Sequence, residues 1–292
     1  MKCLPLVYFL GFSLVLSVLK AEKVRIAVSD LLADTIESAI ADFAEQNSME
    51  FDFYKEGSLP AMERMTSDEL DIAIIAIPDG YLRPDSERYS VIPLAYDLAV
   101  LTVNVDNPLG EISIPQLGGI FGKNETQDYK YWGDLGLSGW TGRSIKAMVV
   151  ETKPSISSEI FKYTALGSKT FKSSINNTDT ENADRVIAND VTCICLVSRA
   201  AKSSQVKTLM VSVDDDMPAY GPSVDNVHYG DYPFRLPFYV VFEKSNTERI
   251  KPILSYLLSE NCSQVLDQDN FYALPDTVRS QLSFELNMTR SE

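Results

Sequence analysis

The chain has 292 residues, of which 45% are hydrophobic and 23% charged, as is ordinary for a folded globular protein. Its formal net charge of −15 produces a field that repels nucleic acid and anionic membrane surfaces, so neither is expected as a partner. The same field repels small anions at long range. An anion site in this chain must therefore work through local dipoles and hydrogen bonds, unless the acidity serves solubility alone.

Residues 1–21 have the features of a secretory signal peptide. Lys2 supplies a positive charge, residues 4–19 form an apolar run, and Ala21 is a small residue ahead of cleavage before Glu22. The apolar run is shorter than the roughly 20 residues that span a bilayer. This favours cleavage over the alternative of a retained membrane anchor, and we expect a periplasmic or secreted protein.

The mature chain begins with strands and helices in alternation. Strands are expected at Val24–Val28, Met49–Tyr54 and Asp71–Ile77, and amphipathic helices over residues 34–46 and 60–66. Regular alternation of this kind predicts an α/β fold in which helices cover both faces of a parallel sheet.

A second α/β unit starts near Tyr96. Further strands are expected at residues 98–103, 146–150, 191–197, 206–213 and 238–242, with helices over 158–166, 249–258 and 262–267 and the end of another at 184–189. Residues 214–231 contain acidic residues, prolines and glycines, and this composition predicts a loop.

Short motifs follow one another in a characteristic order between residues 92 and 276. They are Ile92-Pro-Leu-Ala-Tyr-Asp97 and the strand after it, which ends in Asn107-Pro108, then Ile114-Pro-Gln-Leu117, Ile120-Phe-Gly122, Tyr131-Trp-Gly-Asp-Leu-Gly136, Cys193-Ile-Cys-Leu-Val-Ser198, Gly230-Asp-Tyr-Pro-Phe-Arg-Leu-Pro-Phe-Tyr239 and Phe271-Tyr-Ala-Leu-Pro-Asp276. In this order they resemble the phosphate-binding proteins of bacterial ABC transporters, and the resemblance covers nearly the whole mature chain.

The resemblance implies a two-lobed type II periplasmic binding protein fold. Its first lobe would comprise residues 22–95 and 236–292 and its second lobe residues 96–235, joined by two crossover strands around 95–104 and 230–240. It also implies a monomer that binds phosphate or a related oxyanion in the cleft between the lobes, with an ABC transporter permease as partner.

Three strand-to-helix loops are the candidate ligand-binding loops. They are Ser29-Asp30-Leu31, Gly57-Ser58 and Ser155-Ile156-Ser157. Hydroxyls and free N–H groups at helix N-termini bind anions, and glycine lets a backbone approach a ligand closely. Helix capping is the alternative role for these serines. We expect the loops to converge on one cleft, because ligands of open α/β sheets collect outside the carboxyl ends of the strands.

Some of these positions depart from the family pattern. Asp30 introduces a carboxylate, and Ile156 replaces a glycine. The family also has an arginine about four residues before the third loop, where this chain has Glu151 and Thr152 with Lys153 nearby. An arginine binds an oxyanion through two hydrogen bonds. Its loss should weaken phosphate binding on the order of tenfold to a hundredfold.

Two other functions remain open. The same scaffold with an altered site would be a sensor or interaction module that binds another small ligand or none. A hydrolase built around His228, the single histidine, has the least support, because no G-x-S-x-G motif is present. The mature chain has three cysteines, Cys193, Cys195 and Cys262, fewer than the thiolates of a usual structural zinc site. We expect neither a metal nor a cofactor.

Overall fold

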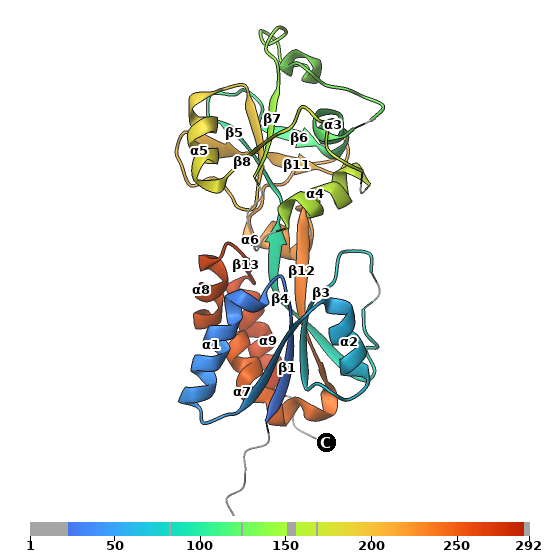
Figure 1. Ribbon diagram of the computed structural model, residues 1–292, viewed down its shortest axis with the longest axis vertical. Coiled ribbons are helices and arrows are strands. Elements are labelled where there is room, and N and C mark those ends of the chain that lie inside the picture. The colour runs from blue at the N-terminus through green and yellow to red at the C-terminus, as the bar shows by residue number, and fades with distance from the viewer. Residues whose placement is uncertain (1–22, 82, 124, 151–155, 168, 289–292) are drawn as a thin grey trace, which may run out of the picture.

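A computed structural model of the protein describes residues 23–81, 83–123, 125–150, 156–167 and 169–288; the predicted signal peptide lies outside them. The molecule is elongated, with two α/β lobes stacked along its long axis (Figure 1). At their junction, strands β4 (Tyr89–Leu98) and β12 (Arg235–Glu243) lie side by side and antiparallel. Among the described residues, no helix is both long enough and apolar enough to cross a membrane.

Within the described chain, the first lobe contains a six-stranded sheet in the order β13-β4-β12-β3-β1-β2. Its remaining strands are β1 (Val24–Ser29), β2 (Phe51–Glu56), β3 (Ile72–Ala76) and β13 (Tyr272–Ala273). Strands β1, β2 and β3 are parallel, and Ser29 at the end of β1 pairs with Glu56 at the end of β2. These three strands therefore end at one edge of the sheet.

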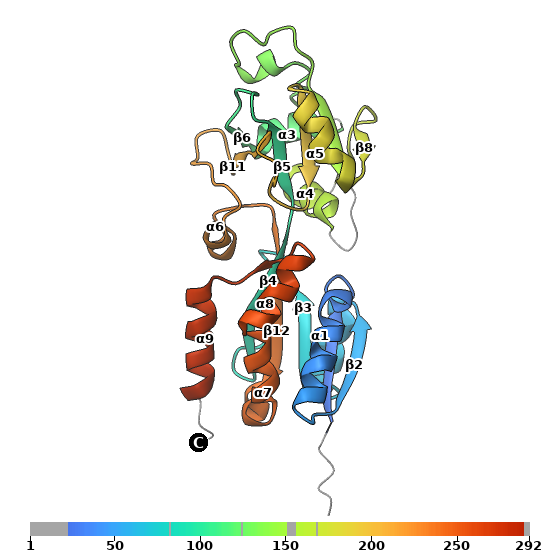
Figure 2. The same cartoon turned by 90° about the vertical axis from the view of Figure 1, so that its left-hand side faces the viewer.

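Several helices around this sheet bury an apolar stripe. In α1, for example, Ile36, Ala39 and Ile40 are buried at helical spacing. Helix α1 packs against α8 (Figure 2). The helices of this lobe are α1 (Ala33–Gln46), α2 (Ser58–Thr66), the 3-10 helix η2 (Lys244–Asn246), α7 (Thr247–Leu257), α8 (Glu260–Gln268) and α9 (Asp276–Met288).

In the part of the second lobe that the structure describes, one sheet has five strands in the order β10-β5-β9-β7-β8, and β11 pairs with β6. The strands are β5 (Val100–Asn104), β6 (Glu111–Ser113), β7 (Lys146–Val150), β8 (Asn176–Thr178), β9 (Cys193–Val197), β10 (Val206–Thr208) and β11 (Met210–Ser212). The helices are α3 (Ile114–Phe121), the 3-10 helix η1 (Trp132–Leu135), α4 (Ser157–Leu166), α5 (Thr180–Asn189) and α6 (Val224–Tyr229).

The structure corrects two of the predicted elements. Residues 214–231 are not all loop, because α6 forms within them. The Ser223 hydroxyl accepts a hydrogen bond from the Asn226 N–H (3.2 Å), and Gly230 ends the helix with a φ of 87°. The expected strand 206–213 is two strands, because β10 pairs with β5 whereas β11 pairs with β6.

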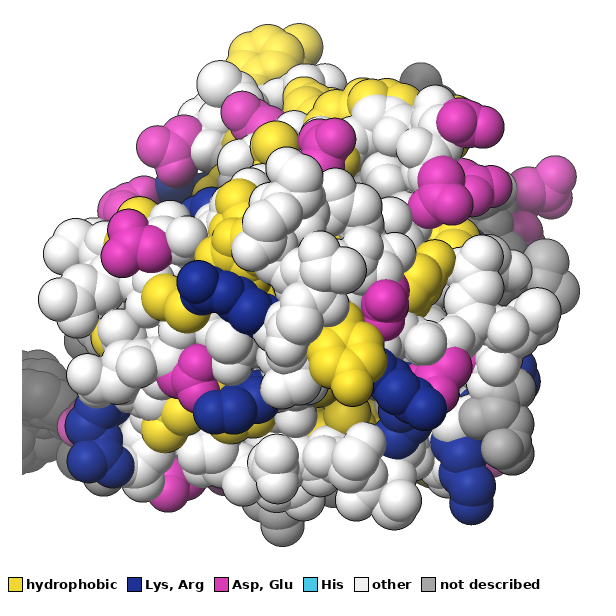
Figure 3. All heavy atoms as spheres, turned by 90° about the horizontal axis from the view of Figure 1, so that it is seen from above, with side chains coloured by type: hydrophobic (Ala, Val, Ile, Leu, Met, Phe, Trp, Pro, Cys, Tyr) yellow, Lys and Arg dark blue, Asp and Glu magenta, His cyan; other side chains and the backbone are white. Residues whose placement is uncertain are grey.

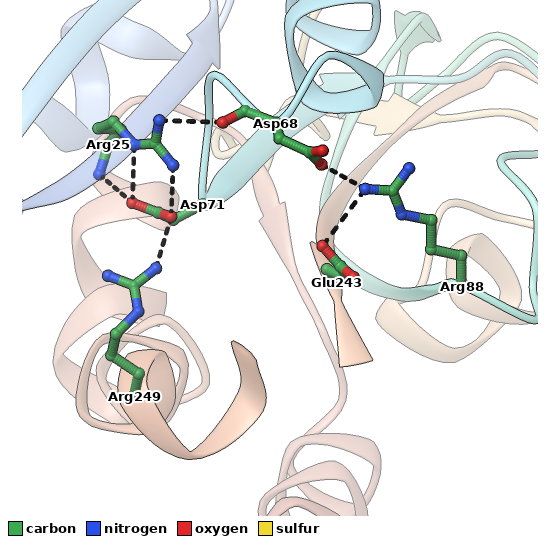
Figure 4. Close-up of polar contacts among 6 residues, drawn as sticks. All are labelled: Arg25, Asp68, Asp71, Arg88, Glu243 and Arg249. Atoms are coloured by element: carbon green, nitrogen blue, oxygen red, sulfur yellow. Dashed lines mark hydrogen bonds and ion pairs between the residues drawn. The ribbon is translucent and has the colours of Figure 1, made fainter. Parts of the chain in front are cut away.

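A carboxylate with two arginine partners ties β1, β3 and α7 together at the base of the first lobe (Figure 4). Asp71 is buried and accepts hydrogen bonds from the Arg25 backbone N–H (2.8 Å), from the Arg25 guanidinium (2.9 Å) and from the Arg249 guanidinium (2.5 Å). Burial alone would raise the pKa of Asp71, but the hydrogen bonds from Arg25 and Arg249 lower it below its ordinary value.

Candidate functional site

The edge at which β1, β2 and β3 end faces the second lobe (Figures 1 and 2). Ser29 is the last residue of β1 and is buried, and its carbonyl oxygen accepts a hydrogen bond from the Leu32 N–H (2.9 Å). Its hydroxyl forms no hydrogen bond within the described residues. Asp30 is exposed and its N–H donates to the Glu56 carbonyl (3.2 Å), while Leu31 is partly buried. Ser29 therefore has a free hydroxyl at the carboxyl edge of the sheet.

Gly57 and Ser58 begin α2 at the same edge. The Ser58 hydroxyl oxygen accepts a hydrogen bond from the Ala76 N–H (3.0 Å), which joins the start of α2 to the end of β3. Gly57 has a φ of −63° and a ψ of 157°, which any residue can adopt. A Cβ added to it would make only an ordinary contact, 3.6 Å from Pro60 Cδ. The fold itself therefore does not require glycine at this position.

The start of α4 is bonded to a carboxylate on the crossover strand β4. The Ile156 N–H donates to Asp97 Oδ2 (2.9 Å), and Asp97 Oδ1 accepts from the Leu98 N–H (2.8 Å). Asp97 is only 2% exposed. Ser157 is the first residue of α4 and is buried, and Ser155 lies outside the described residues. One backbone donor at the start of α4 is thus already bonded to an internal anion.

A cavity of about 500 Å³ lies between the lobes at this point. At this cavity the loop after β3 faces α4. Among the predicted site residues, Ile156 lines it. The lining residues are Pro78 and Asp79 of the first lobe, Ile156, Glu159, Ile160, Tyr163 and Thr164 around α4, and Pro233, Arg235 and Leu236 of the second crossover.

Arg235 holds one wall of this cavity in place. Its Nε and Nη2 donate to the two carboxylate oxygens of Asp79 (2.8 and 3.0 Å), and its Nη1 donates to the carbonyl oxygens of Val227 (2.5 Å) and His228 (2.8 Å). Each guanidinium nitrogen therefore has a partner within the protein. We conclude that Arg235 joins the β3 loop to the crossover and is not available as a ligand-binding cation.

His228 is bonded to the first crossover strand. Its Nδ1 lies 2.9 Å from the Tyr96 hydroxyl. Burial lowers the pKa of His228, and the positive charge of Arg235 lowers it further. The ring is thus neutral at pH 7 and joined to a tyrosine, whereas a serine hydrolase triad would join it to a nucleophilic serine.

Within the described residues, no side-chain oxygen caps the start of α1, α2 or α4. Their N-cap residues are Leu32, Gly57 and Ile156. In contrast, side-chain oxygens of Ser113, Asp179, Ser223 and Ser259 cap α3, α5, α6 and α8. Helix α7 also lacks one, but it continues directly from η2.

The missing caps leave first-turn N–H groups of α1 and α2 available to an external anion. The capping alternative for Ser157 is wrong, because the residue lies inside α4. Sequence reasoning missed the contacts of Asp97, Asp79 and Arg235, which meet their partners only through the fold. The uncapped starts themselves could have been noticed, because leucine, glycine and isoleucine supply no side-chain oxygen.

A larger cavity, of about 680 Å³, lies in the second lobe at the opposite end of β7, where Lys146 begins the strand. Its lysines are largely neutralised, since Asp128 lies 2.6 Å from Lys172 and 3.3 Å from Lys130. Figure 3 shows basic and acidic side chains interspersed on the outer end of this lobe. That end does not present a field of one sign, so we place the candidate site at the lobe junction.

Comparison with known proteins identifies the family. The model of the PBP superfamily domain matches residues 19–261, well over half of the chain. The chain belongs to the PBP superfamily. A phosphate-binding protein PstS from Pseudomonas aeruginosa strain PAO1 is 23% identical over 290 residues, which cover 92% of this chain and 90% of the relative.

Solved structures confirm the fold. The PstS of Borrelia burgdorferi matches with a TM-score of 0.68 and 12% identity, over 87% of this chain and 99% of its own. An ABC-type phosphate transport receptor from Vibrio cholerae matches with a TM-score of 0.64 and 16% identity, over 87% of this chain and 100% of its own. The predicted two-lobed α/β fold of the type II periplasmic binding proteins is thus confirmed.

Proposed function

We propose that the protein is a solute-binding protein that captures inorganic phosphate or a related oxyanion between its lobes and delivers it to an ABC transporter. The observation that carries this proposal is the set of uncapped helix starts at α1, α2 and α4, two in the first lobe and one in the second. Backbone N–H groups at a helix N-terminus, together with the helix dipole, favour an anion there. The relatives named as phosphate-binding proteins support the same ligand class.

The predicted loops lie in both lobes, so each lobe would contribute hydrogen-bond donors to the ligand. Ser29 and Gly57-Ser58 would donate from the first lobe, and Ser155 and Ser157 from the second, where the Ile156 N–H is already bonded to Asp97. The Ser29 hydroxyl is unbonded among the described residues, and the Ser58 hydroxyl accepts a hydrogen bond but can still donate its own proton. Both groups can therefore donate to a phosphate oxygen without breaking a bond of the fold.

Binding should be moderate rather than tight. Asp79 and Asp97 place carboxylates at the junction, and Arg235 is fully bonded to protein groups. Like charges at short range oppose an oxyanion, most strongly the dibasic form of phosphate. This electrostatic balance is consistent with the loss of the family's arginine before the third loop.

The proposal includes export, with residues 1–21 removed as a signal peptide, and action as a monomer that docks on the permease. Intact mass of the exported protein tests the first point, because cleavage before Glu22 predicts a chain that lacks Met1. Sedimentation of the purified mature chain tests the second, because a monomer keeps one sedimentation coefficient across a hundredfold range of concentration.

A thermal-shift panel tests the ligand class. The mature chain is melted with phosphate, sulfate, molybdate, acetate and no addition at one ionic strength. A ligand that binds only the folded state stabilises it by about 2.7 kcal/mol at a hundredfold excess over its Kd. We expect phosphate or another tetrahedral oxyanion to raise the Tm and acetate to leave it unchanged. Equal Tm values under all conditions would refute oxyanion binding.

One observation favours a second candidate function. The Asp97 carboxylate already accepts the Ile156 N–H at the start of α4, so the protein supplies an anion of its own where the ligand would bind. A protein with a permanently occupied site would be a sensor or interaction module on the same scaffold. The panel separates the two functions, because such a module shows no oxyanion-dependent rise in Tm.

A further inference from the structure

Arg199 lies two residues after the end of β9, at the carboxyl edge of the second lobe's sheet. Strand β9 runs parallel to β7, with Leu196 beside Val149. Val150, the last residue of β7, lines a small cavity together with Arg199 and Asp184. The chain that leaves β7 leads to α4. Arg199 is thus on the same edge of the sheet as the start of α4.

The Arg199 guanidinium has no hydrogen-bond or ion-pair partner among the described residues. Its Nη1 is buried and has no hydrogen-bond partner, and Arg199 forms no ion pair within the described residues. Asp184 lines the same cavity but does not bridge to it. A buried charged donor without a partner is costly. Arg235 shows the contrast, because each of its three nitrogens is bonded to a protein oxygen.

A second polar group on this lobe is also unpaired. Ser158 is in the first turn of α4 and only 8% exposed, and its buried hydroxyl has no hydrogen-bond partner in the described chain. Helix α4 packs against β9, the strand that leads to Arg199. A guanidinium and a hydroxyl that can both donate therefore come from neighbouring elements of one lobe.

Arg199 is also next to the first lobe. The N–H of the following residue, Ala200, donates to the Tyr272 hydroxyl (3.4 Å), and Tyr272 belongs to β13 of the first sheet. Burial raises the pKa of Tyr272, and the positive charge of Arg199 is among the groups that act on it in the opposite direction. The Arg199 segment is thus at the lobe junction and not at the outer end of the second lobe.

We propose that Arg199 is the cation of the oxyanion site and that Ser158 donates beside it. This inference rests on the proposed function and names the side chain whose positive charge would attract an oxyanion to an acidic protein. A guanidinium can bind two oxygens of one phosphate through parallel N–H donors. Protein groups already bind the Arg235 guanidinium. For Arg199, the ligand would be the partner.

The test is calorimetric titration of the mature chain with inorganic phosphate, for the wild type and for Arg199→Gln. We expect Arg199→Gln to weaken binding about tenfold to a hundredfold, the value of a charge-assisted hydrogen bond. Arg185→Gln is the matched control. It removes the same charge from an exposed residue of α5 whose guanidinium bonds to Asn182, and it should bind phosphate like the wild type.

Thermal melts without ligand separate binding from folding. Because the Arg199 guanidinium has no partner among the described residues, Arg199→Gln should melt at or above the wild-type Tm. A merely structural arginine would instead lower the Tm and leave the affinity unchanged. If Arg199→Gln fails to fold, Arg199→Lys decides, because it keeps the charge but loses the paired donors and should bind several-fold more weakly than wild type. Ser158→Ala should weaken binding several-fold without lowering the Tm.

The outcomes distinguish this inference from the proposed function. If the wild type binds phosphate and Arg199→Gln binds as Arg185→Gln does, the role of Arg199 is refuted and the proposed function stands. If the wild type shows no heat of binding with phosphate and no Tm shift with any oxyanion of the thermal-shift panel, both are refuted.

Discussion

Replacement of Gly57 by alanine separates what the fold needs from what a ligand needs. The backbone at Gly57 is compatible with alanine, and the new Cβ would meet only Pro60 Cδ at 3.6 Å. Reduced freedom of the unfolded chain stabilises such a variant by about 0.4–1 kcal/mol. Alanine is a poorer N-cap than glycine, which costs a similar amount. We therefore expect the free energy of unfolding to change by less than about 1 kcal/mol.

Phosphate binding should respond far more strongly. The added methyl group would stand at the uncapped start of α2 and keep an oxyanion from at least one backbone donor. Loss of one charge-assisted hydrogen bond, about 1.5–3 kcal/mol, lowers the affinity about tenfold to a hundredfold. Calorimetric titration measures the affinity, and urea denaturation measures the stability of the same samples.

Gly110→Ala is the control for this experiment. Gly110 is exposed and lies between β5 and β6 of the second lobe, away from the lobe junction. A Cβ added to it would have no atom within 4 Å. It should bind phosphate like the wild type. The reasoning is refuted if Gly57→Ala binds as tightly as Gly110→Ala, because the ligand then does not approach the start of α2.

Two further predictions concern stability and thiol chemistry. Asp71→Asn should lower the free energy of unfolding at pH 7 by about 1–3 kcal/mol, less than for a fully buried pair because Arg25 and Arg249 are about a third exposed. The folded-state pKa of Asp71 is lowered. Its contribution to the free energy of unfolding is therefore present above the unfolded pKa of about 3.9 and is lost as the pH falls through the folded value. In urea denaturation from pH 7 to pH 3, the free energy of unfolding should fall less with pH in the variant than in the wild type. Burial raises the pKa of Cys193 to about 11 and those of Cys195 and Cys262 to about 12. The native mature chain should therefore not react with a disulfide reagent at pH 8, and three thiols should react in urea. Rapid labelling of the native chain would contradict this.

Much of the fold could be predicted because its determinants are local or ordered along the chain. Apolar runs at β1 and β3 separated by an amphipathic helix indicate a parallel α/β unit, and the ordered motifs from Ile92 to Asp276 indicate the two-lobed family. Helix α6 was not predicted, although Ser223 and Gly230 mark its two ends, because it is short and embedded in turn-forming residues.

The site was harder to predict because its chemistry depends on single positions and on contacts between lobes. Whether Ser157 caps α4 or lies inside it depends on a shift of one residue, and helix ends are the least certain part of such predictions. The bond from Ile156 to Asp97 joins residues 59 positions apart. The pairing of Arg235 with Asp79 likewise arises only when the two lobes meet.

The most direct test of the central claim is a crystal structure of the mature chain grown in phosphate. We predict density for a tetrahedral anion at the lobe junction, within hydrogen-bond distance of Ser29, Gly57-Ser58 and Ser157, with the Arg199 guanidinium turned toward it. A junction without such density at saturating phosphate, or an anion bound only elsewhere on the protein, would contradict the account.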